Sequence, residues 1–450
     1  MERKYDIIII GTGTAGRTLA SRARSSGLKF SIIDSREYGG TCPLRGCDPK
    51  KVLASASEAT DWNNRLIGKG AGTKDPLEVD WPSLIEFKRT FTEDYPREAE
   101  KMFTDLGIDM YRGRAYFADE DTVIVGEDKL KGKYIFIATG SKPRKLGIPG
   151  EEYLTTSEEF METEKLPQKI IFIGGGYISF EFAHIAKRAG SEVLILHRSE
   201  RPLGPFDPDM VDLLVKASET AGIKFLTNNP VAAIEKEEDG FLVKTEFKTK
   251  SRSETRTFHA EMVVNGAGRV PDIEDLKLEN AGVKAEKKGI IVNKHMQTSN
   301  PHVYAGGDCV ADGMQLTPVA TLQGKVAASN ILDGDGAEVD YAGIPSAVFT
   351  IPVLASVGVN ASKDSDKYRV IFRDRHDWKT TRRAGIDFAA SKIVLDETSN
   401  RIIGAHILGP NAEEAINIFA MAIRLNLSLS DLKKVIFTYP TVCSDIPYML

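Results

Sequence analysis

Near the start of the chain, unbroken runs of apolar residues are separated by a glycine-rich turn and a helix-like stretch. Residues 7–10 are four successive isoleucines, and such a run is typical of a parallel strand buried on both faces. The turn follows at residues 11–16, then the helix-like stretch to Arg24 and a second apolar strand at residues 30–33. This order of strand, turn, helix and strand predicts a dinucleotide-binding unit.

The same arrangement recurs in the middle of the chain, with a strand at residues 169–173, a turn at residues 174–179 and a strand at residues 193–196. In both units the residue after the second strand lies 23 residues beyond the first glycine of the turn, and it is Asp34 in one and His197 in the other. Two such units predict electron transfer between two dinucleotides, one a tightly held flavin and the other an exchanging nicotinamide.

The glycines of both turns let the backbone approach a pyrophosphate at a helix N-terminus. They are Gly11, Gly13 and Gly16 in the first unit and Gly174 and Gly176 in the second. Asp34 is expected to accept hydrogen bonds from an adenosine ribose.

In the second unit the place of this carboxylate is taken by residues of opposite charge. His197 is followed by Arg198, and positive charge there suits the 2′-phosphate of NADPH better than the bare ribose of NADH. Arg201 is expected to assist. Two alternatives remain open: Glu200 could bind a bare ribose, and Arg198 could be a solvated surface arginine.

Composition narrows the class of protein. The chain has 450 residues and a net charge of −5, which allows several domains and gives no electrostatic case for nucleic acid or an anionic membrane. No apolar run approaches the ~18 residues of a membrane helix, and the first run is too short for a signal peptide. Four cysteines are too few for a disulfide scaffold, so we expect a cytoplasmic protein.

Two of the cysteines, Cys42 and Cys47, lie five residues apart at the start of a stretch that has a helical pattern through Arg65. A helix N-terminus lowers the pKa of a thiol and so favours the reactive thiolate. This spacing is not a standard zinc spacing, and the remaining Cys and His residues provide no second ligand pair. A redox-active pair is therefore the preferred interpretation, with inert thiols as the alternative.

The sequence from residue 39 to residue 50, Gly-Gly-Thr-Cys-x₄-Cys-x-Pro-Lys, resembles the signature of the class I pyridine nucleotide–disulfide oxidoreductases. This family includes glutathione reductase, dihydrolipoamide dehydrogenase and mercuric reductase. The resemblance covers essentially the whole chain, because further family motifs follow in order at residues 134–140, 266–272, 303–308 and 316–318.

The resemblance implies roles for individual residues. Cys42 would be the interchange thiol that attacks the substrate, and Cys47 the charge-transfer thiol against FAD. Lys50 would lie near the reactive flavin nitrogen, paired with Glu181, and Tyr177 would cover the flavin until nicotinamide displaces it. The remaining cofactor-binding positions implied are Thr41, Thr139, Gly140, Arg269, Asp308, Leu316 and Thr317, with Asp308 at the ribityl chain and the helix after Leu316 facing the flavin pyrimidine.

We expect an α/β fold with two Rossmann-like domains and a C-terminal α+β dimerisation domain. The FAD-binding domain is placed at residues 1–145 and 267–335, the inserted NADPH-binding domain at 146–266 and the dimerisation domain at 336–450. In the last of these, strands are expected at residues 347–351, 368–372 and 392–395 and a helix at 412–425. A homodimer is implied by the resemblance.

The C-terminal segment departs from the family pattern. Most family members have His-Pro-Thr-x-x-Glu, whose histidine acts as acid and base on the departing thiol, but here Tyr439 stands in the histidine position and Ser444 in the glutamate position. Asp445 lies one residue beyond the glutamate position. Mercuric reductases have a tyrosine at this place, yet their C-terminal vicinal cysteines have no counterpart. Cys443 could be an extra thiol or a buried small residue.

Three functions therefore remain open. The first is reduction of a low-molecular-weight or small-protein disulfide by NADPH, FAD and the Cys42–Cys47 pair. The second is reduction of a thiophilic metal ion or a quinone with the same dithiol and Tyr439. The third is a dihydrolipoamide dehydrogenase-like subunit, which the His197-Arg198 pair and the missing histidine disfavour.

Overall fold

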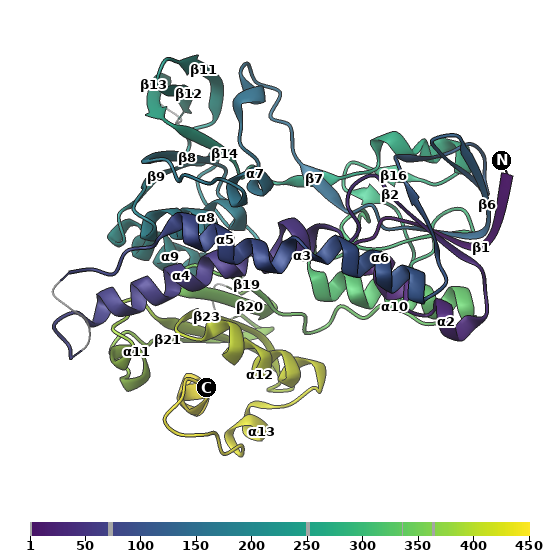
Figure 1. The fold of residues 1–450 in the computed structure, drawn as a ribbon. Helices are drawn as coiled ribbons and strands as arrows, with labels where there is room; N and C mark the ends of the chain where they lie inside the picture. The colour runs from purple at the N-terminus through teal and green to yellow at the C-terminus, as the bar shows by residue number, and fades with distance from the viewer. Residues whose placement is uncertain (1, 71–74, 249–252, 335, 362–364) are drawn as a thin grey trace. The chain divides into compact units, whose positions relative to one another are not determined.

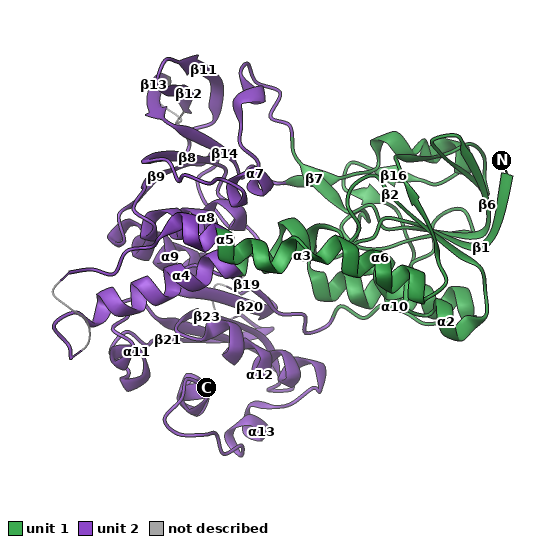
Figure 2. Ribbon diagram, viewed as in Figure 1, with its two compact units in different colours: residues 1–51, 86–144, 269–341 green, residues 52–85, 145–268, 342–450 purple. Residues whose placement is uncertain are grey.

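The structure is a computed structural model that describes residues 2–70, 75–248, 253–334, 336–361 and 365–450 (Figure 1). The chain forms two compact units (Figure 2). Unit 1 comprises residues 1–51, 86–144 and 269–341, and unit 2 comprises residues 52–85, 145–268 and 342–450. Asp335, at the expected boundary of the dimerisation domain, lies outside the described residues, and the domain boundaries stay a prediction.

Unit 1 is built on a seven-stranded sheet in which β1 (Glu2–Ile10) lies between β2 (Phe30–Asp34) and β6 (Asp128–Ile137), parallel to both. The sheet continues on one side to β3 (Asp109–Arg112) and on the other to β18 (Val303–Ala305), β5 (Thr122–Val125) and β4 (Ala115–Phe117). Helices α1 (Thr14–Ala20) and α10 (Thr317–Leu332) pack together, because Gly324 lets α10 approach the Ala15 carbonyl closely.

The isoleucine run forms a central strand because both faces of β1 are buried. Ile8 and Ile10 belong to one apolar core and Ile7 and Ile9 to another, so this part of the strand has no solvent face that would require polar residues. The predicted helix up to Arg24 is instead two helices, α1 and α2 (Ala23–Ser26), interrupted where the Ser21 hydroxyl donates to the Thr18 carbonyl.

Unit 2 contains a second parallel sheet, in the order β10 (Ile223–Leu226), β9 (Glu192–Leu196), β8 (Lys169–Ile173) and β14 (Met262–Asn265). Strand β8 is buried on both faces like β1, because Ile170 and Phe172 lie in one apolar core and Ile171 and Ile173 in another. Helix α8 (Tyr177–Arg188) connects β8 to β9, and helix α9 (Pro208–Thr220) connects β9 to β10. Between β10 and β14 the chain forms an antiparallel sheet of β11 (Val231–Glu237), β12 (Gly240–Lys248) and β13 (Ser253–Ala260).

The C-terminal part of unit 2 is an antiparallel sheet with helix α12 (Ala412–Arg424) packed on it. Its strands, in spatial order, are β19 (Ser346–Val348), β20 (Val353–Gly358), β23 (Ile402–Gly409), β22 (Ala390–Asp396) and β21 (Tyr368–Asp374). The strands and the helix expected in this region are confirmed, except that β19 ends three residues early, at Val348. Short helices complete it: α11 (Lys379–Arg383), α13 (Leu429–Lys433) and α14 (Ile446–Met449).

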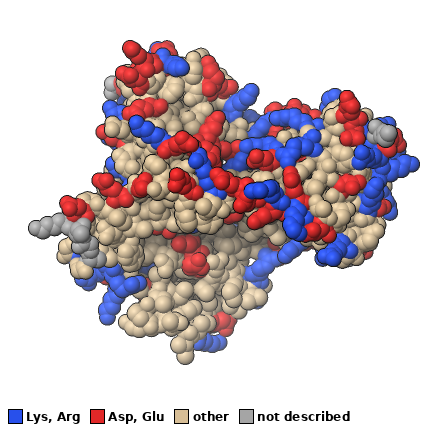
Figure 3. All heavy atoms as spheres, in the orientation of Figure 1, with Lys and Arg blue, Asp and Glu red and all other residues tan. Residues whose placement is uncertain are grey.

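Acidic and basic side chains intermingle over most of the face shown in Figure 3, whereas the region of α12 and the C-terminal segment is sparsely charged on that face. Among the described helices, none combines the length and the apolar character needed to cross a lipid bilayer.

Candidate active site

The first glycine turn joins β1 to α1 and leaves one side of the helix N-terminus open. Gly11 has a φ of +109°, and a Cβ there would lie 2.2 Å from the Ala138 carbonyl oxygen, so only glycine fits. Gly13 is the N-cap of α1, and a Cβ on it would meet nothing within 4 Å. This open, unsubstituted N-terminus fits a pyrophosphate.

Asp34, at the end of β2, is fixed beside this turn. One carboxylate oxygen accepts hydrogen bonds from the backbone N–H and the hydroxyl of Thr12, at 2.9 and 2.5 Å, and the other accepts from the Arg36 N–H at 3.0 Å. The Thr12 hydroxyl oxygen also accepts from the N–H of Gly39, which links the turn to the loop before the cysteines. The position of Asp34 fits its predicted role at a ribose.

The loop that precedes the cysteines packs directly on the glycine turn. Gly40 has a φ of +76°, and a Cβ on it would lie 2.4 Å from the Gly13 Cα. The helix α3 (Thr41–Arg45) begins immediately afterwards with the exposed Thr41. The expected FAD-binding residues Gly13 and Thr41 are therefore brought to the same place.

The residues around Asp308, which is expected at the ribityl chain, also assemble within unit 1. The Asp308 carboxylate accepts a hydrogen bond from the Ser141 hydroxyl at 3.0 Å, and burial raises the pKa of this carboxyl. Arg269 donates to the same hydroxyl oxygen at 3.0 Å and to the Ser141 carbonyl at 2.5 Å. Strands β7 (Ser141–Pro143) and β15 (Arg269–Pro271) pair here, just after Gly140, whose φ is +70°.

The two cysteines converge on one hydroxyl. Cys42 lies in α3, and Cys47 is the first residue of α4 (Cys47–Leu66). The Thr317 hydroxyl lies 3.3 Å from the Cys42 sulfur and 3.5 Å from the Cys47 sulfur. Thr317 is the first residue of α10, with Leu316 as its N-cap, so both sulfurs lie at the N-terminus of a helix.

The two thiols have opposite pKa shifts. A hydrogen bond from Cys42 lowers the pKa of Cys47 to about 6, against the opposing effect of burial and with further help from Thr317 and the positive charge of Lys50. The same hydrogen bond and burial raise the pKa of Cys42. At neutral pH the pair therefore holds one thiolate, on Cys47, and one thiol, on Cys42.

The second glycine turn precedes α8. Gly174, with a φ of +109°, packs against Gly266, and Gly176 is the N-cap of α8. Ser179 occupies the position of the third glycine, and a Cβ on Gly266 would lie 2.0 Å from its hydroxyl oxygen. The close packing that a third glycine normally permits is therefore provided here by Gly266, directly after β14.

Burial disfavours positive charge on His197 at the expected second site. The His197 ring lies against Gly175, and burial lowers its pKa, against the effect of the hydrogen bond between Nε2 and the Arg201 carbonyl at 3.0 Å. Arg198 is exposed. The Arg201 guanidinium is also exposed but lies 3.4 Å from the Asp212 carboxylate, which offsets its charge.

Helix α8 carries two further predicted site residues. Tyr177, its first residue, is 45% exposed, and its role as a cover of the flavin stays a prediction. Glu181, one turn later, is 2% exposed and accepts a hydrogen bond from the Phe349 N–H at 2.8 Å, so it is not a surface charge. Lys50 is half-buried in α4, and its pairing with Glu181 stays a prediction.

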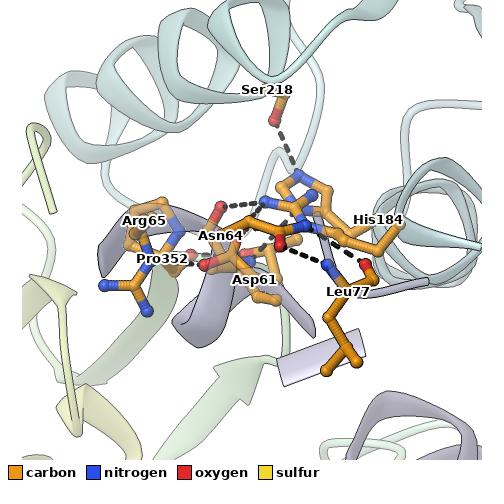
Figure 4. Close-up of polar contacts among 10 residues, drawn as sticks. Asp61, Asn64, Arg65, Leu77, His184, Ser218 and Pro352 are labelled. Atoms are coloured by element: carbon orange, nitrogen blue, oxygen red, sulfur yellow. Dashed lines mark hydrogen bonds and ion pairs between the residues drawn. The ribbon is translucent and has the colours of Figure 1, made fainter. Parts of the chain in front are cut away.

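A buried polar network in unit 2 was not expected from the sequence (Figure 4). His184, also on α8, is fully buried, and burial holds its pKa well below the usual value. Its Nδ1 accepts from the Ile351 N–H at 3.1 Å, and its Nε2 lies 2.9 Å from the Ser218 hydroxyl oxygen. Since that hydroxyl donates to the Leu214 carbonyl, Ser218 is the acceptor from His184 and is not an activated nucleophile.

The same network ties α8 to α4. Arg188 donates to Asp61 through Nη2 at 2.9 Å and Nε at 3.2 Å, and Arg65 donates to the other Asp61 oxygen at 2.5 Å. The only sequence signal was the spacing of four residues in the pairs His184–Arg188 and Asp61–Arg65 on predicted helices. Such spacing is common on exposed helices, so the sequence did not show that these four residues form a buried network.

The C-terminal segment presents Tyr439, which is 75% exposed. Ser444 donates to the Thr441 carbonyl at 2.6 Å. Asp445 accepts from the Thr380 hydroxyl, and burial raises the pKa of its carboxyl. Cys443 is half-buried, and burial raises its pKa as well, so it has no feature of an activated thiol.

Together these features define a redox protein with two dinucleotide-type glycine turns and a polarised dithiol. The family model described as pyridine nucleotide-disulphide oxidoreductase matches residues 5–324, and that of the dimerisation domain of the same enzymes matches residues 344–449. The chain belongs to the pyridine nucleotide-disulphide oxidoreductase family, whose enzymes use FAD and a pyridine nucleotide and include glutathione reductases, mercuric reductases and dihydrolipoyl dehydrogenases.

Individual relatives support this membership over the whole chain. The glutathione reductase of Nostoc sp. (strain PCC 7120 / SAG 25.82 / UTEX 2576) is 31% identical over 99% of this chain and 99% of its own length. The mercuric reductase of Staphylococcus aureus is 30% identical over 98% of this chain and 81% of its own length. A solved structure, the Cu(II) complex of the HOCl-induced flavoprotein disulfide reductase RclA from Escherichia coli, matches with a TM-score of 0.87, 26% identity and 99% coverage of both chains.

Proposed function

We propose that this chain is an NADPH-dependent flavoprotein disulfide reductase that passes electrons through FAD to Cys42 and Cys47 and on to a disulfide substrate. The observation that supports it most strongly is the pair of sulfurs within 3.5 Å of the Thr317 hydroxyl, one with a pKa of about 6 and the other with a raised pKa. Bound FAD supplies the two-electron link between nicotinamide and dithiol.

Substrate reduction is then a pair of thiol–disulfide exchanges. The Cys42 sulfur, after passing its proton across the hydrogen bond to Cys47, attacks one substrate sulfur, and the substrate S–S bond breaks. One substrate thiolate leaves and takes up a proton, while Cys42 holds the other half as a mixed disulfide. Cys47 then attacks the Cys42 sulfur, which releases the second thiol and leaves a Cys42–Cys47 disulfide.

The first glycine turn and the residues gathered near it are proposed to hold FAD. The Gly13 N-cap would face the pyrophosphate, Asp34 the adenosine ribose and Asp308 the ribityl chain. These assignments rest on the open side of Gly13, on the Asp34 carboxylate at the end of β2 and on the Asp308 carboxylate shortly after β18, which both accept hydrogen bonds from protein groups.

NADPH is proposed as the electron donor because Arg198 is exposed at the end of β9, where a ribose 2′-phosphate would lie. The burial of His197 leaves this arginine as the main local cation. Glutathione reductases and dihydrolipoyl dehydrogenases both resemble the chain, so the preference for NADPH depends on this residue.

The protein is proposed to act as a homodimer in the cytoplasm, with Tyr439 completing the partner's site. The match to a dimerisation domain and a set of exposed apolar side chains in unit 2 support the dimer. These side chains are Met421, Leu425, Val435, Ile436, Tyr439 and Tyr448.

A second candidate substrate is a thiophilic metal ion, with a quinone as a related possibility. Mercuric reductases are 30% identical to the chain, and the similar RclA structure is a Cu(II) complex. A dithiol that presents a thiolate at neutral pH binds soft cations well. Tyr439 favours substrates that need little protonation, because a phenol of pKa ~10 is a weak proton donor.

A turnover panel tests both candidates. NADPH and NADH would each be combined with glutathione disulfide, an aromatic disulfide, Hg(II), Cu(II) and a quinone, using wild type, Cys42→Ser and Cys47→Ser. We expect NADPH-dependent turnover of one substrate class that either substitution abolishes, whereas Cys309→Ala, at a fully buried core thiol, retains it. Turnover that survives the loss of both cysteines would contradict the proposal, and NADH-linked oxidation of dihydrolipoamide would favour the dehydrogenase alternative.

A further inference from the structure

The side chain of Gln323 is a buried polar group within helix α10. Its Oε1 accepts a hydrogen bond from the Gly307 N–H at 2.7 Å, and its Nε2 donates to the Tyr341 hydroxyl oxygen at 2.7 Å. All three residues belong to unit 1, so these contacts lie within one compact part of the chain. An N–H can only donate, so the carboxamide oxygen has to face Gly307 and the orientation of the amide is fixed.

The chain packs tightly against this carboxamide. A Cβ on Gly306 would lie 3.3 Å from the Gln323 Cβ, and the next residue, Gly307, has a φ of +83°. Gly313 has a φ of +122°, and a Cβ on it would lie 2.8 Å from the Gln323 Nε2. Residues 306–313 therefore contact Gln323 at both ends of the segment. Asp308, the residue proposed to face the ribityl chain, lies between these two contacts.

Asp308 directly follows the residue that Gln323 holds. Its carboxylate accepts from the Ser141 hydroxyl at 3.0 Å, and the peptide before it belongs to Gly307, a residue type with unusual backbone freedom. The Val310 N–H bonds to the Gly307 carbonyl at 3.2 Å within the same turn, whereas Gln323 joins this turn to helix α10. The direction of the Asp308 side chain therefore depends on the bond between Gly307 and Gln323.

We propose that Gln323 is a positioning residue of the flavin site: its carboxamide, with Tyr341 at the other end, holds Gly307 and so directs the Asp308 carboxylate at the ribityl chain of FAD. This inference deepens the proposed function, because it rests on the proposed contact between Asp308 and that chain. Loss of Gln323 should weaken the binding of FAD but not that of ADP, which has the adenosine and pyrophosphate but no ribityl chain.

FAD binding by the full chain tests the proposal without turnover. FAD is removed, its Kd is measured by the quenching of flavin fluorescence, and the Kd for ADP at the same site follows from its competition with FAD. Gln323→Leu, which cannot accept from the Gly307 N–H, should raise the Kd for FAD about tenfold. Tyr341→Phe removes the second partner of the carboxamide and should raise it about threefold. The Kd for ADP should change less than about twofold in both variants.

Gln297→Leu is the matched control. Gln297 is a half-buried glutamine of unit 1 whose Nε2 donates to the Pro301 carbonyl at 3.0 Å and to the Tyr304 hydroxyl oxygen at 3.3 Å, so its loss should leave the Kd for FAD unchanged. Tyr341→Phe, which removes a single hydroxyl, keeps the test decisive if Gln323→Leu fails to fold. An unchanged Kd for FAD in both variants overturns the proposal, and so does an equal rise for FAD and ADP.

An Asp308→Ala background shows whether Gln323 acts through Asp308. In that background Gln323→Leu should raise the Kd for FAD less than about twofold, because the carboxylate that it positions is already absent. Additive losses overturn the proposal, since Gln323 would then affect FAD by another route.

The outcome is separable from that of the proposed function, because no measurement of Kd needs a substrate. If wild type binds FAD but reduces no disulfide, metal ion or quinone, the proposed function fails while the Kd values still decide the role of Gln323. If wild type turns over and the Kd for FAD is unchanged in both Gln323→Leu and Tyr341→Phe, the inference fails and the proposed function stands.

Discussion

The hydroxyl of Thr317 lies 3.3 Å from the sulfur of Cys42, although 275 residues separate them in the chain. The same hydroxyl lies 3.5 Å from the Cys47 sulfur, and Thr317 begins helix α10. A hydroxyl at a helix N-terminus stabilises negative charge on sulfur, and Thr317 lowers the pKa of both thiols. The hydrogen bond between the thiols raises the pKa of Cys42 and lowers that of Cys47, so the negative charge of the pair lies on Cys47.

The Cys47 thiolate should titrate near pH 6. Its pKa of about 6 lies below the ordinary thiol value, so the thiolate persists above this pH and is lost as the pH falls through it. In the FAD-loaded, two-electron-reduced protein, the long-wavelength charge-transfer absorbance should fade with a midpoint near pH 6. Thr317→Val, which keeps the shape but removes the hydroxyl, should raise this midpoint.

Cysteine variants check the assignment of the two thiols. The charge-transfer band should vanish in Cys47→Ser and persist in Cys42→Ser. A band that shows the opposite behaviour would mean that the roles are reversed, and a protein that stays colourless after reconstitution with FAD would contradict the flavin site itself.

Arg198→Ala should lower kcat/KM with NADPH by roughly 10- to 100-fold, because a charge-assisted hydrogen bond to a phosphate contributes ~1.5–3 kcal/mol. The value with NADH should change much less. Arg201→Ala is the comparison, since Arg201 already faces Asp212 at 3.4 Å and should matter less. Equal losses with both nucleotides would show that Arg198 is structural.

Tyr439→Phe should impair turnover of the preferred substrate, and Tyr439→His should raise turnover of glutathione disulfide. A departing thiolate needs a proton donor of pKa near 7, which a histidine of pKa ~6.5 provides better than a phenol of pKa ~10. Tyr448→Phe, at a tyrosine that is 71% exposed, is the matched control. The measurement is the steady-state rate with glutathione disulfide, an aromatic disulfide and Hg(II).

Rapid reduction of glutathione disulfide that does not respond to Tyr439→Phe would exclude this role of the tyrosine. Asp445 would then be the first alternative acid. Burial raises its pKa toward neutrality, although its carboxylate already accepts a hydrogen bond from Thr380.

Asp61→Asn should destabilise unit 2 by about 3–5 kcal/mol, because it leaves the buried Arg188 guanidinium without its counter-ion. The side chains of Arg188 and Asp61 are 10% and 13% exposed. Asp105→Asn removes a pair with Lys101 whose side chains are 58% and 74% exposed, and should change Tm little. Thermal unfolding of the holoenzyme measures both, and equal shifts in Tm would contradict a structural role for the network.

The sequence alone determined the elements that depend on neighbours along the chain. The isoleucine run predicted β1 and the second apolar run β2, and the glycine spacing located both turns at the starts of α1 and α8. These predictions succeed because a buried strand and a tight turn each impose their residue types over a few consecutive positions. The cysteine signature and the ordered motifs predicted the family, which the family models confirm.

Only the tertiary structure decided which distant side chains share an environment. It brought Thr317 to the cysteines, buried Glu181 and partly buried His197. None of this is encoded in local spacing, because a pKa depends on burial and on charges contributed by segments far apart in sequence. Packing therefore gave two chemically identical thiols different pKa values, and it lowered the pKa of His197, whose position had suggested a positive charge.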